Sequence, residues 1–457
     1  MGEYKSMVEA PTGWLGSIPE HWECKKIGSL FSERKTKVSD ADYPPLSVTK
    51  LGIVSQLANA AKSDSGDNRK LVCSGDFVIN SRSDRKGSCG VSELAGSVSL
   101  INIVLTPRNS WDNKYVHYLM RSQSFSEEYY HYGRGIVADL WTTRYSEMKN
   151  ILLPVPPHDE QEQIVRFLDW KVSGINKLIN IKKKEIERLC ELRNSTIDSG
   201  ILHGFHHGDM KSSGIYWLGD IPSTWEVMPI KRVAKINASV ADIVKVLNDE
   251  ELLTFLPMEN VSERGEIDCS IKRPLKEIKS GYSSFAKGDV VVAKITPCFE
   301  NGKGACLDTL DTEIGFGTTE FINLRPGDEI LSRYLYMITM TQHFRKLGER
   351  VMTGSAGQKR ISANYIKNFT LGIPAIKEQE KILKKLDSTL SKIDELIEIK
   401  KSEISGLHEL KNRLISDVVT GNIDVRDIEI PEYEFTDESA DSDLGDVDFD
   451  VDEEQED

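Results

Sequence analysis

The chain has 457 residues, enough for two to four domains, and its 39% apolar content suffices for real hydrophobic cores. A formal net charge of -14 argues at first against nucleic acid as a partner. However, 16 of the 72 acidic residues and none of the 58 basic residues lie from Asp427 onward, so residues 1–426 are close to neutral and do not exclude DNA.

The cysteines and the apolar runs exclude two further classes of protein. Seven cysteines are scattered without a C-x-x-C pair, which predicts free thiols rather than a disulfide framework or a zinc site. No stretch approaches 18 uninterrupted apolar residues, and the first residues lack the pattern of a signal peptide. We therefore expect a cytoplasmic protein that does not contact a membrane.

Two aromatic-rich motifs open the two halves of the chain. The sequence "GWLGSIPEHWE" at 13–23 returns as "YWLGDIPSTWE" at 216–226. The pairs Trp14/Trp22 and Trp217/Trp225 have the ring area of base-stacking platforms, but they recur while their surroundings diverge. This recurrence favours packing in the core.

The region that follows each opening has a mixed pattern. The runs "GDFVIN" (75–80) and "VSLINIVLTP" (98–107) predict strands, and 114–130 predicts a helix. The second half has the same order, with strands predicted in "GDVVVA" (288–293) and "TEFINLRP" (319–326) and a helix over 332–349. We expect a β-rich sheet with flanking helices in each of two domains, at 1–157 and 215–375.

A long charged helix is predicted twice. Residues 160–198 and 378–416 align without a gap and are identical at 20 of 39 positions, which identifies an internal repeat. In both copies apolar residues recur at steps of three and four, so helices are expected over 158–201 and 376–421. Their stripes are expected to pack through equivalent residues of the two helices: Leu168, Ile175, Ile179, Ile186, Leu386, Ile393, Ile397 and Ile404.

The pairing of these helices predicts an overall arrangement. A helix of about 40 residues is roughly 60 Å long, too long for one small core, so the two are expected to form an antiparallel coiled coil with a domain at each end. Asp159, with Glu162 three residues on, is the expected N-cap of the first helix, and Lys377 occupies the equivalent position in the second. Lys182 and Lys400 interrupt the stripe, either fixing its register or extending to solvent.

Two segments lie outside the repeat. Residues 202–214 are expected to form a linker. The tail 427–457 has too little apolar surface to offset its ordering entropy and is expected to be disordered. Its role is either solubility or competition with DNA phosphates for basic surface.

Enzyme motifs are missing from the sequence. It contains no Walker loop and no Asn/Asp-Pro-Pro-aromatic run of the amino-methyltransferases. His203, His206 and His207 stand beside Asp209 with only loose metal-ligand spacing, so solvated histidines are expected. We therefore expect neither a catalytic site nor a metal site.

The order of the motifs resembles a known family. The paired "W-L-G-x-I-P-x-x-W-E" openings, the "E-Q" entries into the long helices and the exit "LKNRLISDVVTGNI" (410–423) are similar to the specificity subunit of type I restriction-modification enzymes. The resemblance covers about residues 13–426. The expected fold class is α+β, with two mixed α/β target recognition domains, two long antiparallel coiled-coil helices and an internal pseudo-twofold repeat.

This resemblance implies partners and excludes catalysis by the chain itself. It implies that each recognition domain reads half of a bipartite double-stranded DNA target and that the helices form the spacer and dock two methylation (M) subunits. Restriction (R) subunits would join through these. S-adenosylmethionine, ATP and Mg would then belong to the partner subunits. The competing hypothesis is a non-enzymatic coiled-coil scaffold whose domains bind other proteins.

Candidate DNA contacts come from Gly- and Ser-rich basic loops, because cations bind phosphates and Arg, Gln, Asn or Ser read base edges. The first half offers "NSRSDRKGS" (80–88), and the second offers "CFENGKG" (298–304) and "TGSAGQKRIS" (353–362). The candidate residues are Arg82, Arg85, Lys86, Lys303, Gln358, Lys359 and Arg360. A solvated loop is the alternative for each.

Overall fold

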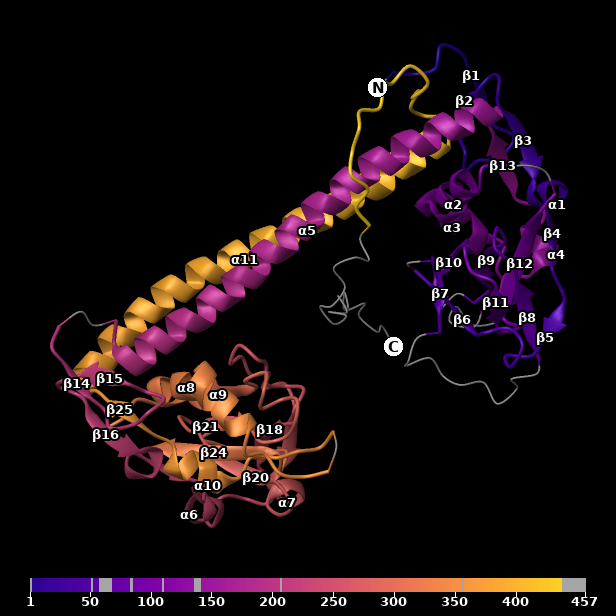
Figure 1. The fold of residues 1–457 in the computed structure, drawn as a ribbon. Coiled ribbons are helices and arrows are strands. Elements are labelled where there is room, and N and C mark those ends of the chain that lie inside the picture. The colour runs from indigo at the N-terminus through magenta and orange to yellow at the C-terminus, as the bar shows by residue number, and fades with distance from the viewer. Residues whose placement is uncertain are drawn as a thin grey trace. The chain divides into compact units, whose positions relative to one another are not determined.

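The protein divides into two compact units. The computed structural model describes residues 2–50, 52–56, 68–82, 85–108, 111–134, 141–205, 208–355 and 357–437 (Figure 1). Unit 1 comprises Met1–Lys184 with Lys400–Asp457, and unit 2 comprises Glu185–Ile399. These units do not follow the predicted domain boundaries, because each unit contains part of both long helices.

Unit 1 is built on an antiparallel four-stranded sheet. Its strands, in spatial order, are β10 (Cys89–Val91), β9 (Phe77–Asn80), β12 (Asn102–Pro107) and β4 (Phe31–Glu33). A three-stranded sheet adds β11 (Gly96–Val98), β8 (Arg69–Val72) and β5 (Lys37–Val38). Three strand pairs complete the unit: β1 (Met7–Glu9) with β2 (Ser17–Pro19), β3 (Glu23–Lys26) with β13 (Leu152–Val155), and β6 (Leu46–Thr49) with β7 (Gly52–Ser55).

Unit 2 repeats the central sheet of unit 1. The order β22 (Gly304–Cys306), β21 (Val290–Ala293), β24 (Phe321–Pro326), β17 (Ala234–Ile236) matches the order in unit 1, strand by strand. Two strand pairs are also equivalent: β14 (Met210–Ser212) with β15 (Asp220–Pro222), and β16 (Glu226–Pro229) with β25 (Thr370–Ile373). The Gly-Asp turns before β9 and β21 were predicted correctly, since Gly75 and Gly288 have φ of 88° and 84°.

Unit 2 has a second sheet of four strands. Its order is β19 (Lys272–Pro274), β18 (Leu252–Leu256), β23 (Ile314–Gly317), β20 (Ser283–Ala286), with β18 and β23 parallel. It has its own small core around Phe255 and Phe316. Short helical segments connect the strands of the two units: α1 (Ile27–Leu30), α4 (Tyr145–Met148), η3 (Ile230–Arg232), α6 (Ala241–Val244), α7 (Leu275–Ile278), η4 (Leu307–Thr309) and α10 (Ala363–Asn368).

Each predicted flanking helix is in fact two helices. Unit 1 has α2 (Asn113–Arg121) and α3 (Gln123–His131), and unit 2 has α8 (Ser332–Met340) and α9 (Gln342–Glu349). The breaks fall at Ser122 and Thr341, whose side chains accept hydrogen bonds from the backbone N–H groups of Phe125 and Phe344, both at 3.3 Å. These hydroxyls cap a new helix, so the prediction of one continuous helix was wrong in both halves.

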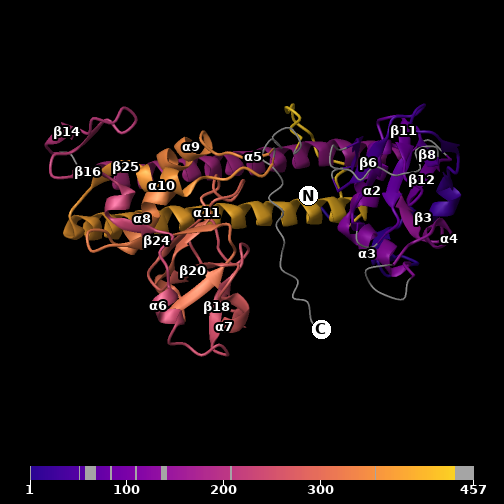
Figure 2. The same ribbon diagram turned by 90° about the horizontal axis from the view of Figure 1, so that it is seen from below.

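The long helices are α5 (His158–His203) and α11 (Ile376–Val419). Within each unit their segments run side by side and antiparallel (Figure 2). In unit 1 Lys182 binds Glu403 at 2.9 Å, and in unit 2 Arg193 binds Asp394 at 3.0 Å. Of the eight predicted packing residues, two are half-buried, Ile186 and Ile404, and the other six are buried: Leu168, Ile175, Ile179, Leu386, Ile393 and Ile397.

The two lysines in the stripe contact one carboxylate. Lys400 also binds Glu403, at 3.2 Å, so Lys182 and Lys400 share its side chain. These contacts lower the pKa of the Glu403 carboxyl. Lys182 and Lys400 are equivalent positions of the repeat, and their binding of one carboxylate favours the register hypothesis for these lysines.

The starts of both long helices differ from the predicted caps. The carbonyl of Pro157 accepts from the N–H groups of Glu160 and Gln161, and the carbonyl of Ala375 accepts from those of Glu378 and Gln379. Asp159 and Lys377 therefore lie inside the first turn, and their prediction as N-cap positions was wrong. The first helical hydrogen bonds go to the carbonyls of Pro157 and Ala375, so these two residues are the N-caps.

The Glu-Gln pair at each helix entry joins the helix to its unit. Gln379 is fully buried; its Oε1 accepts from the N–H of Leu331 at 2.9 Å, and its Nε2 donates to the carbonyls of Glu329 and Pro374 at 2.9 Å each. In unit 1 Gln161 likewise accepts from the N–H of Asp112 and donates to the carbonyl of Pro156. The repeated glutamine thus fixes the start of α8 or α2 against the long helix.

The long helices also end alike. Gly204 and Gly421 have φ of 66° and 81°, and each lies so close to Trp225 or Trp22 that a Cβ would approach the indole within 3.1 Å. Trp22 and Trp225 are buried in their cores, which confirms the packing role predicted for them. The predicted linker 202–214 was wrong in part, since α5 continues to His203 and residues 210–212 form β14.

The start of the predicted tail is ordered in unit 1. Gln163 donates to the carbonyls of Val425 and Ile428, at 3.0 and 2.8 Å, and Ser173 donates to the carbonyl of Glu434 at 3.1 Å. The prediction of disorder therefore fails for 427–437. The rest of the tail, from 438 onward, lies outside the described residues.

Candidate nucleic-acid interface

Two predicted loops of unit 2 lie next to each other. Residues 353–355 and 357–360 belong to a hairpin in which Thr353 and Arg360 exchange backbone hydrogen bonds of 3.1 and 2.8 Å. The turn after β21 joins it, because the N–H of Thr296 donates to the carbonyl of Lys359 at 3.0 Å. Lys303 closes the same turn, donating its N–H to the carbonyl of Cys298. The candidates of the second half are thereby brought together on one surface.

The side chains on these loops differ in accessibility. Gln358 and Lys359 are exposed at the end of the hairpin, whereas Lys303 is half-buried. Arg360 is exposed but already paired, since its Nε and Nη2 each donate to the Glu320 carboxylate at 2.9 Å. This bidentate pair lowers the pKa of Glu320 and raises that of Arg360. Gln358 and Lys359 are therefore accessible, whereas the charge of Arg360 is neutralised by Glu320.

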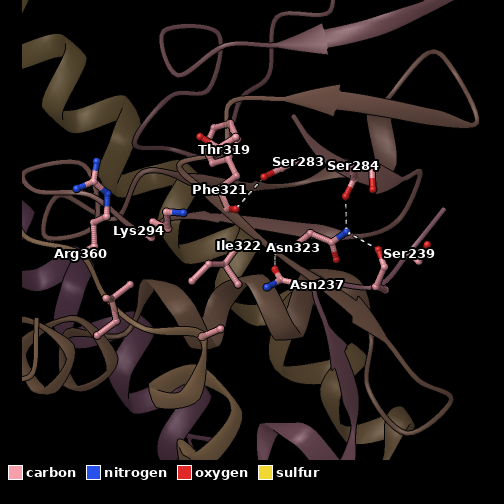
Figure 3. A pocket seen from close by; sticks show the side chains of 13 residues that line it. Asn237, Ser239, Ser283, Ser284, Lys294, Thr319, Phe321, Ile322, Asn323 and Arg360 are labelled. Atoms are coloured by element: carbon pink, nitrogen blue, oxygen red, sulfur yellow. Dashed lines mark hydrogen bonds between the residues drawn. The ribbon is translucent and has the colours of Figure 1, made fainter. Parts of the chain in front are cut away.

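A polar groove of about 570 Å³ extends from Arg360 across the central sheet (Figure 3). Its floor is Asn323 on β24, whose Nδ2 donates to the carbonyls of Ser284 and Ala238 at 2.6 and 3.2 Å. Among the described residues the Oδ1 of Asn323 has no hydrogen-bond partner. Apolar residues also line the groove, among them Phe321 and Ile322. Its other amides, hydroxyls and cations are Asn237, Ser239, Ser283, Ser284, Lys294, Thr319 and Arg360. These are the groups that hydrogen-bond base edges and phosphates.

Replacing Glu320 with glutamine tests the neutralisation of Arg360. We expect Glu320→Gln to raise non-specific affinity for duplex DNA by roughly three- to tenfold at low salt, because it frees a cation beside the groove. The slope of log affinity against log salt should steepen by about 0.9 for each added phosphate contact. Glu313→Gln, an equal change of charge at an exposed site outside the groove, is the matched control. Equal effects of the two variants would contradict a specific role for the pair.

Unit 1 has an equivalent surface. The turn after β9 is closed by hydrogen bonds from the N–H of Arg85 to the carbonyl of Arg82 and from the N–H of Ser88 to the carbonyl of Arg85. Arg82, Arg85 and Lys86 are all exposed. The Lys86 ammonium lies 5.2 Å from the ring centroid of Tyr130 on α3, which supports the turn. The three predicted candidates of the first half are thus grouped on one turn.

Unit 1 also has a backbone pairing that corresponds to the hairpin of unit 2, and the sequence analysis missed it. Arg134 and Thr142 exchange backbone hydrogen bonds of 3.3 and 3.1 Å, and Thr142 also forms a β-bridge with Arg82. Unit 2 has the same arrangement, in which Arg360 forms β-bridges with both Thr353 and Ile295. Residues 135–140 lie outside the described residues. The available signal was the repeat, since both hairpins precede their long helix by a similar distance.

Other predicted chemistry is limited. Within the described ranges, no three or more His, Cys, Asp or Glu side chains cluster so as to hold a metal ion. His203 contacts the carbonyl of Asp220, and His206 and His207 lie outside the described residues. All seven cysteines are free, as predicted. No helix in the described part of the chain is sufficiently long and apolar to span a bilayer.

Comparison with known proteins gives matches to one family and to several of its members. Residues 19–188 and 222–406 match the model of the type I restriction modification DNA specificity domain. The chain is 39% identical over 180 residues to the type I restriction enzyme EcoAI specificity subunit of Escherichia coli, which covers 39% of this chain and 30% of that protein. It is 25% identical over 443 residues to the MjaVIII specificity subunit of Methanocaldococcus jannaschii, covering 90% of this chain and 95% of that one.

The fold is also similar to a solved one. This chain aligns, with a TM-score of 0.62, to a chain from structural work on complex assembly and conformational transition of the type I R-M system. The two are 15% identical, and the match covers 89% of this chain and 99% of that chain. The match to the EcoAI and EcoEI specificity subunits of Escherichia coli spans only about a third of their lengths. The structural likeness concerns the fold with its two-part repeat.

Proposed function

The chain belongs to the type I restriction-modification DNA specificity family, and from this we propose that it selects the DNA target of a type I restriction-modification complex. The observation that carries the proposal is the repeated surface. Each unit joins the turn that follows its Gly-Asp strand to a hairpin preceding the long helix, and both surfaces expose cations. Two divergent copies of one surface suit a target with two different half-sites.

We infer that unit 1 reads one half-site and unit 2 the other. In unit 2, Gln358 reaches base edges, while Lys359 and Lys303 contact phosphates beside the polar groove. In unit 1 the phosphate contacts come from Arg82, Arg85 and Lys86. The support is the exposure of these side chains on adjoining loops, except for Lys303, which is half-buried. Arg360 joins them when DNA phosphate replaces Glu320.

The long helices have the second role in this proposal. As an antiparallel coiled coil, α5 and α11 set the spacing of the half-sites and dock two methylation subunits, through which restriction subunits join. The chain itself provides no catalytic group. S-adenosylmethionine, ATP and Mg belong to the partner subunits, where they supply methyl transfer and ATP-driven translocation and cleavage. The support is the long exposed, charged surface outside the buried stripe of both helices.

Alanine substitutions on the hairpin separate base reading from phosphate binding. Gln358→Ala should relax the preference at one position of one half-site, by about 1–3 kcal/mol, whereas Lys359→Ala should weaken all sequences together and reduce the salt slope by about 0.9. The measurement is selection from a randomised DNA library by the complex at two salt concentrations. Lys279→Ala, at an exposed lysine that directly follows α7 and is already paired with Asp249, is the control. Sequence-independent losses of equal size from both variants would contradict this assignment.

A further inference from the structure

In unit 1 the last described residues, 433–437, lie against α5 and α2. The backbone of residues 434–436 is held by two side chains of α5. The N–H of Thr436 donates to the Ser173 hydroxyl at 2.7 Å, and this hydroxyl donates to the carbonyl of Glu434 at 3.1 Å. Asn176 donates to the carbonyl of Thr436 at 3.3 Å. An extended segment is therefore recognised mainly through its backbone.

Side chains of the segment add to this recognition. The Lys114 ammonium on α2 lies 5.9 Å from the ring centroid of Phe435, while it also binds Asp169 of α5 at 2.9 Å. The segment covers Ser173, which is only 2% exposed. Residues 433–437 thus bury a polar surface of α5 beside α2.

Unit 2 contains a groove at the place that corresponds to the binding surface for residues 433–437 in unit 1. The offset of 218 residues between the long helices relates Ser173 to Ser391 and Asp169 to Asp387, and Arg333 of α8 takes the place of Lys114. Arg333 binds Asp387 at 2.5 Å, as Lys114 binds Asp169. We call this site the α8–α11 groove, defined by six of its lining residues: Arg193, Arg333, Met337, Asp387, Ser391 and Asp394.

The α8–α11 groove is an open space of about 560 Å³, a size typical of ligand-binding clefts. Ser391 is exposed, in contrast to Ser173. Tyr336, which lines the groove and is 5% exposed, has a hydroxyl with no hydrogen-bond partner among the described residues. A buried hydroxyl without a partner costs free energy that a bound polar group would recover.

The lining of the groove suits recognition of a segment through its backbone and an aromatic side chain rather than through its net charge. Arg193 pairs with Asp394 at 3.0 Å and Arg333 with Asp387, so its lining guanidiniums are largely neutralised. Ser391 offers a hydroxyl that both donates and accepts, as Ser173 does for two backbone groups. Arg333 offers a paired cation over which an aromatic ring can lie, as Lys114 does for Phe435.

The segment bound in unit 1 is not the occupant of the groove. The described chain has one segment of this kind, and it is already bound within unit 1. Residues 433–437 are part of the same chain as unit 1, so they bind its surface at an effective concentration near the millimolar range. A second copy of the chain would therefore keep its own segment bound to its own unit 1. A different subunit has no such competing site.

We propose that the α8–α11 groove binds an extended segment of the methylation subunit, with backbone groups at Ser391 and an aromatic side chain over Arg333. This inference rests on the proposed function, because it assumes that a methylation subunit is the partner. It assigns unit 2 a docking site that unit 1 fills with residues 433–437 of its own chain.

A peptide probe tests the groove itself. A fluorescein-labelled peptide of this chain's residues 428–437 should bind the full chain saturably, with a Kd in the range of about 10 μM to 1 mM. Ser391→Tyr, which fills the groove, should weaken binding at least about tenfold. Lys392→Tyr places the same ring at an exposed neighbour outside the groove and should leave binding unchanged. Absence of saturable binding, or equal binding to the Ser391→Tyr protein, would overturn the proposal.

Cross-linking tests the source of the segment. A photo-cross-linking residue in place of Ser391, in the complex co-purified with methylation subunits, should link to one continuous segment of that subunit. The same residue in place of Lys392 should not link to that segment. A complex that methylates its target but gives no such link, or links only to a second copy, overturns the inference while the proposed function stands. A chain that binds no methylation subunit overturns the proposed function and with it the assigned occupant.

Discussion

Replacing Gln379 with alanine is expected to destabilise unit 2 by roughly 3–4 kcal/mol, because three buried hydrogen bonds are lost together. The substitution leaves the N–H of Leu331, which precedes α8, and the carbonyls of Glu329 and Pro374 without their partner. Alanine itself is a good helix former, so helix propensity does not contribute to the loss.

Hydrogen exchange measured by mass spectrometry resolves this effect by unit. Protection of the amides in α8 and in the first turns of α11 should fall by more than about 100-fold, while protection in α2 of unit 1 is retained. Glu380→Ala, at the exposed neighbouring position, should change stability by less than about 0.5 kcal/mol. Unchanged protection in Gln379→Ala would show that the Glu-Gln entry does not hold the helix to its unit.

Lengthening both long helices is expected to change the spacing of the recognised half-sites. Seven residues that continue the apolar stripe, inserted after Lys184 and after Ile399, add about 10.5 Å to each helix, which corresponds to about three base pairs. Three base pairs also turn the second half-site by roughly 100° about the DNA axis, so affinity should fall even at the new preferred spacing.

The same insertion in one helix alone has a different expected result. It displaces the stripe of one helix against an unchanged partner, including the contact of Glu403 with Lys182 and Lys400, so the chain should lose stability and aggregate. Selection from a library of targets with variable spacers measures the outcome for the double insertion. An unchanged spacer preference would contradict the role of α5 and α11 as the spacer.

The repeat made most of the architecture predictable. Apolar residues at steps of three and four located both long helices, and the Gly-Asp runs located β9 and β21. The predicted recognition loops lie next to each other in unit 2 because the backbone of Lys359 pairs with that of Thr296. The residues in DNA contact stay predictions, since exposure shows accessibility rather than binding.

The features that were missed depend on contacts distant in sequence. The polar groove combines Asn237, Ser284 and Asn323, which lie in three separate segments and are joined by hydrogen bonds of Asn323. The breaks at Ser122 and Thr341 are local, but continuous apolar spacing concealed their capping hydroxyls.

The ordered start of the tail was missed for a different reason. Its acidic composition predicted disorder, yet apolar residues recur in "IEIPEYEF" (428–435) and Ile428 and Ile430 pack against the unit 1 core. The side chains of Ser173 and Asn176 satisfy its backbone, which composition alone does not reveal. Average composition over 427–457 combined an ordered segment with the acidic residues that follow it.

Mapping methylated bases in DNA exposed to the complex of this chain with its methylation subunits tests the central claim most directly. The expected result is adenine methylation at one bipartite sequence, with two specified half-sites separated by a spacer of fixed length, and with Gln358→Ala relaxing only one of them. Methylation at an unbroken sequence, methylation that is unchanged when this chain is left out, or binding of partner proteins without any DNA preference would contradict it, and the last of these would identify a scaffold.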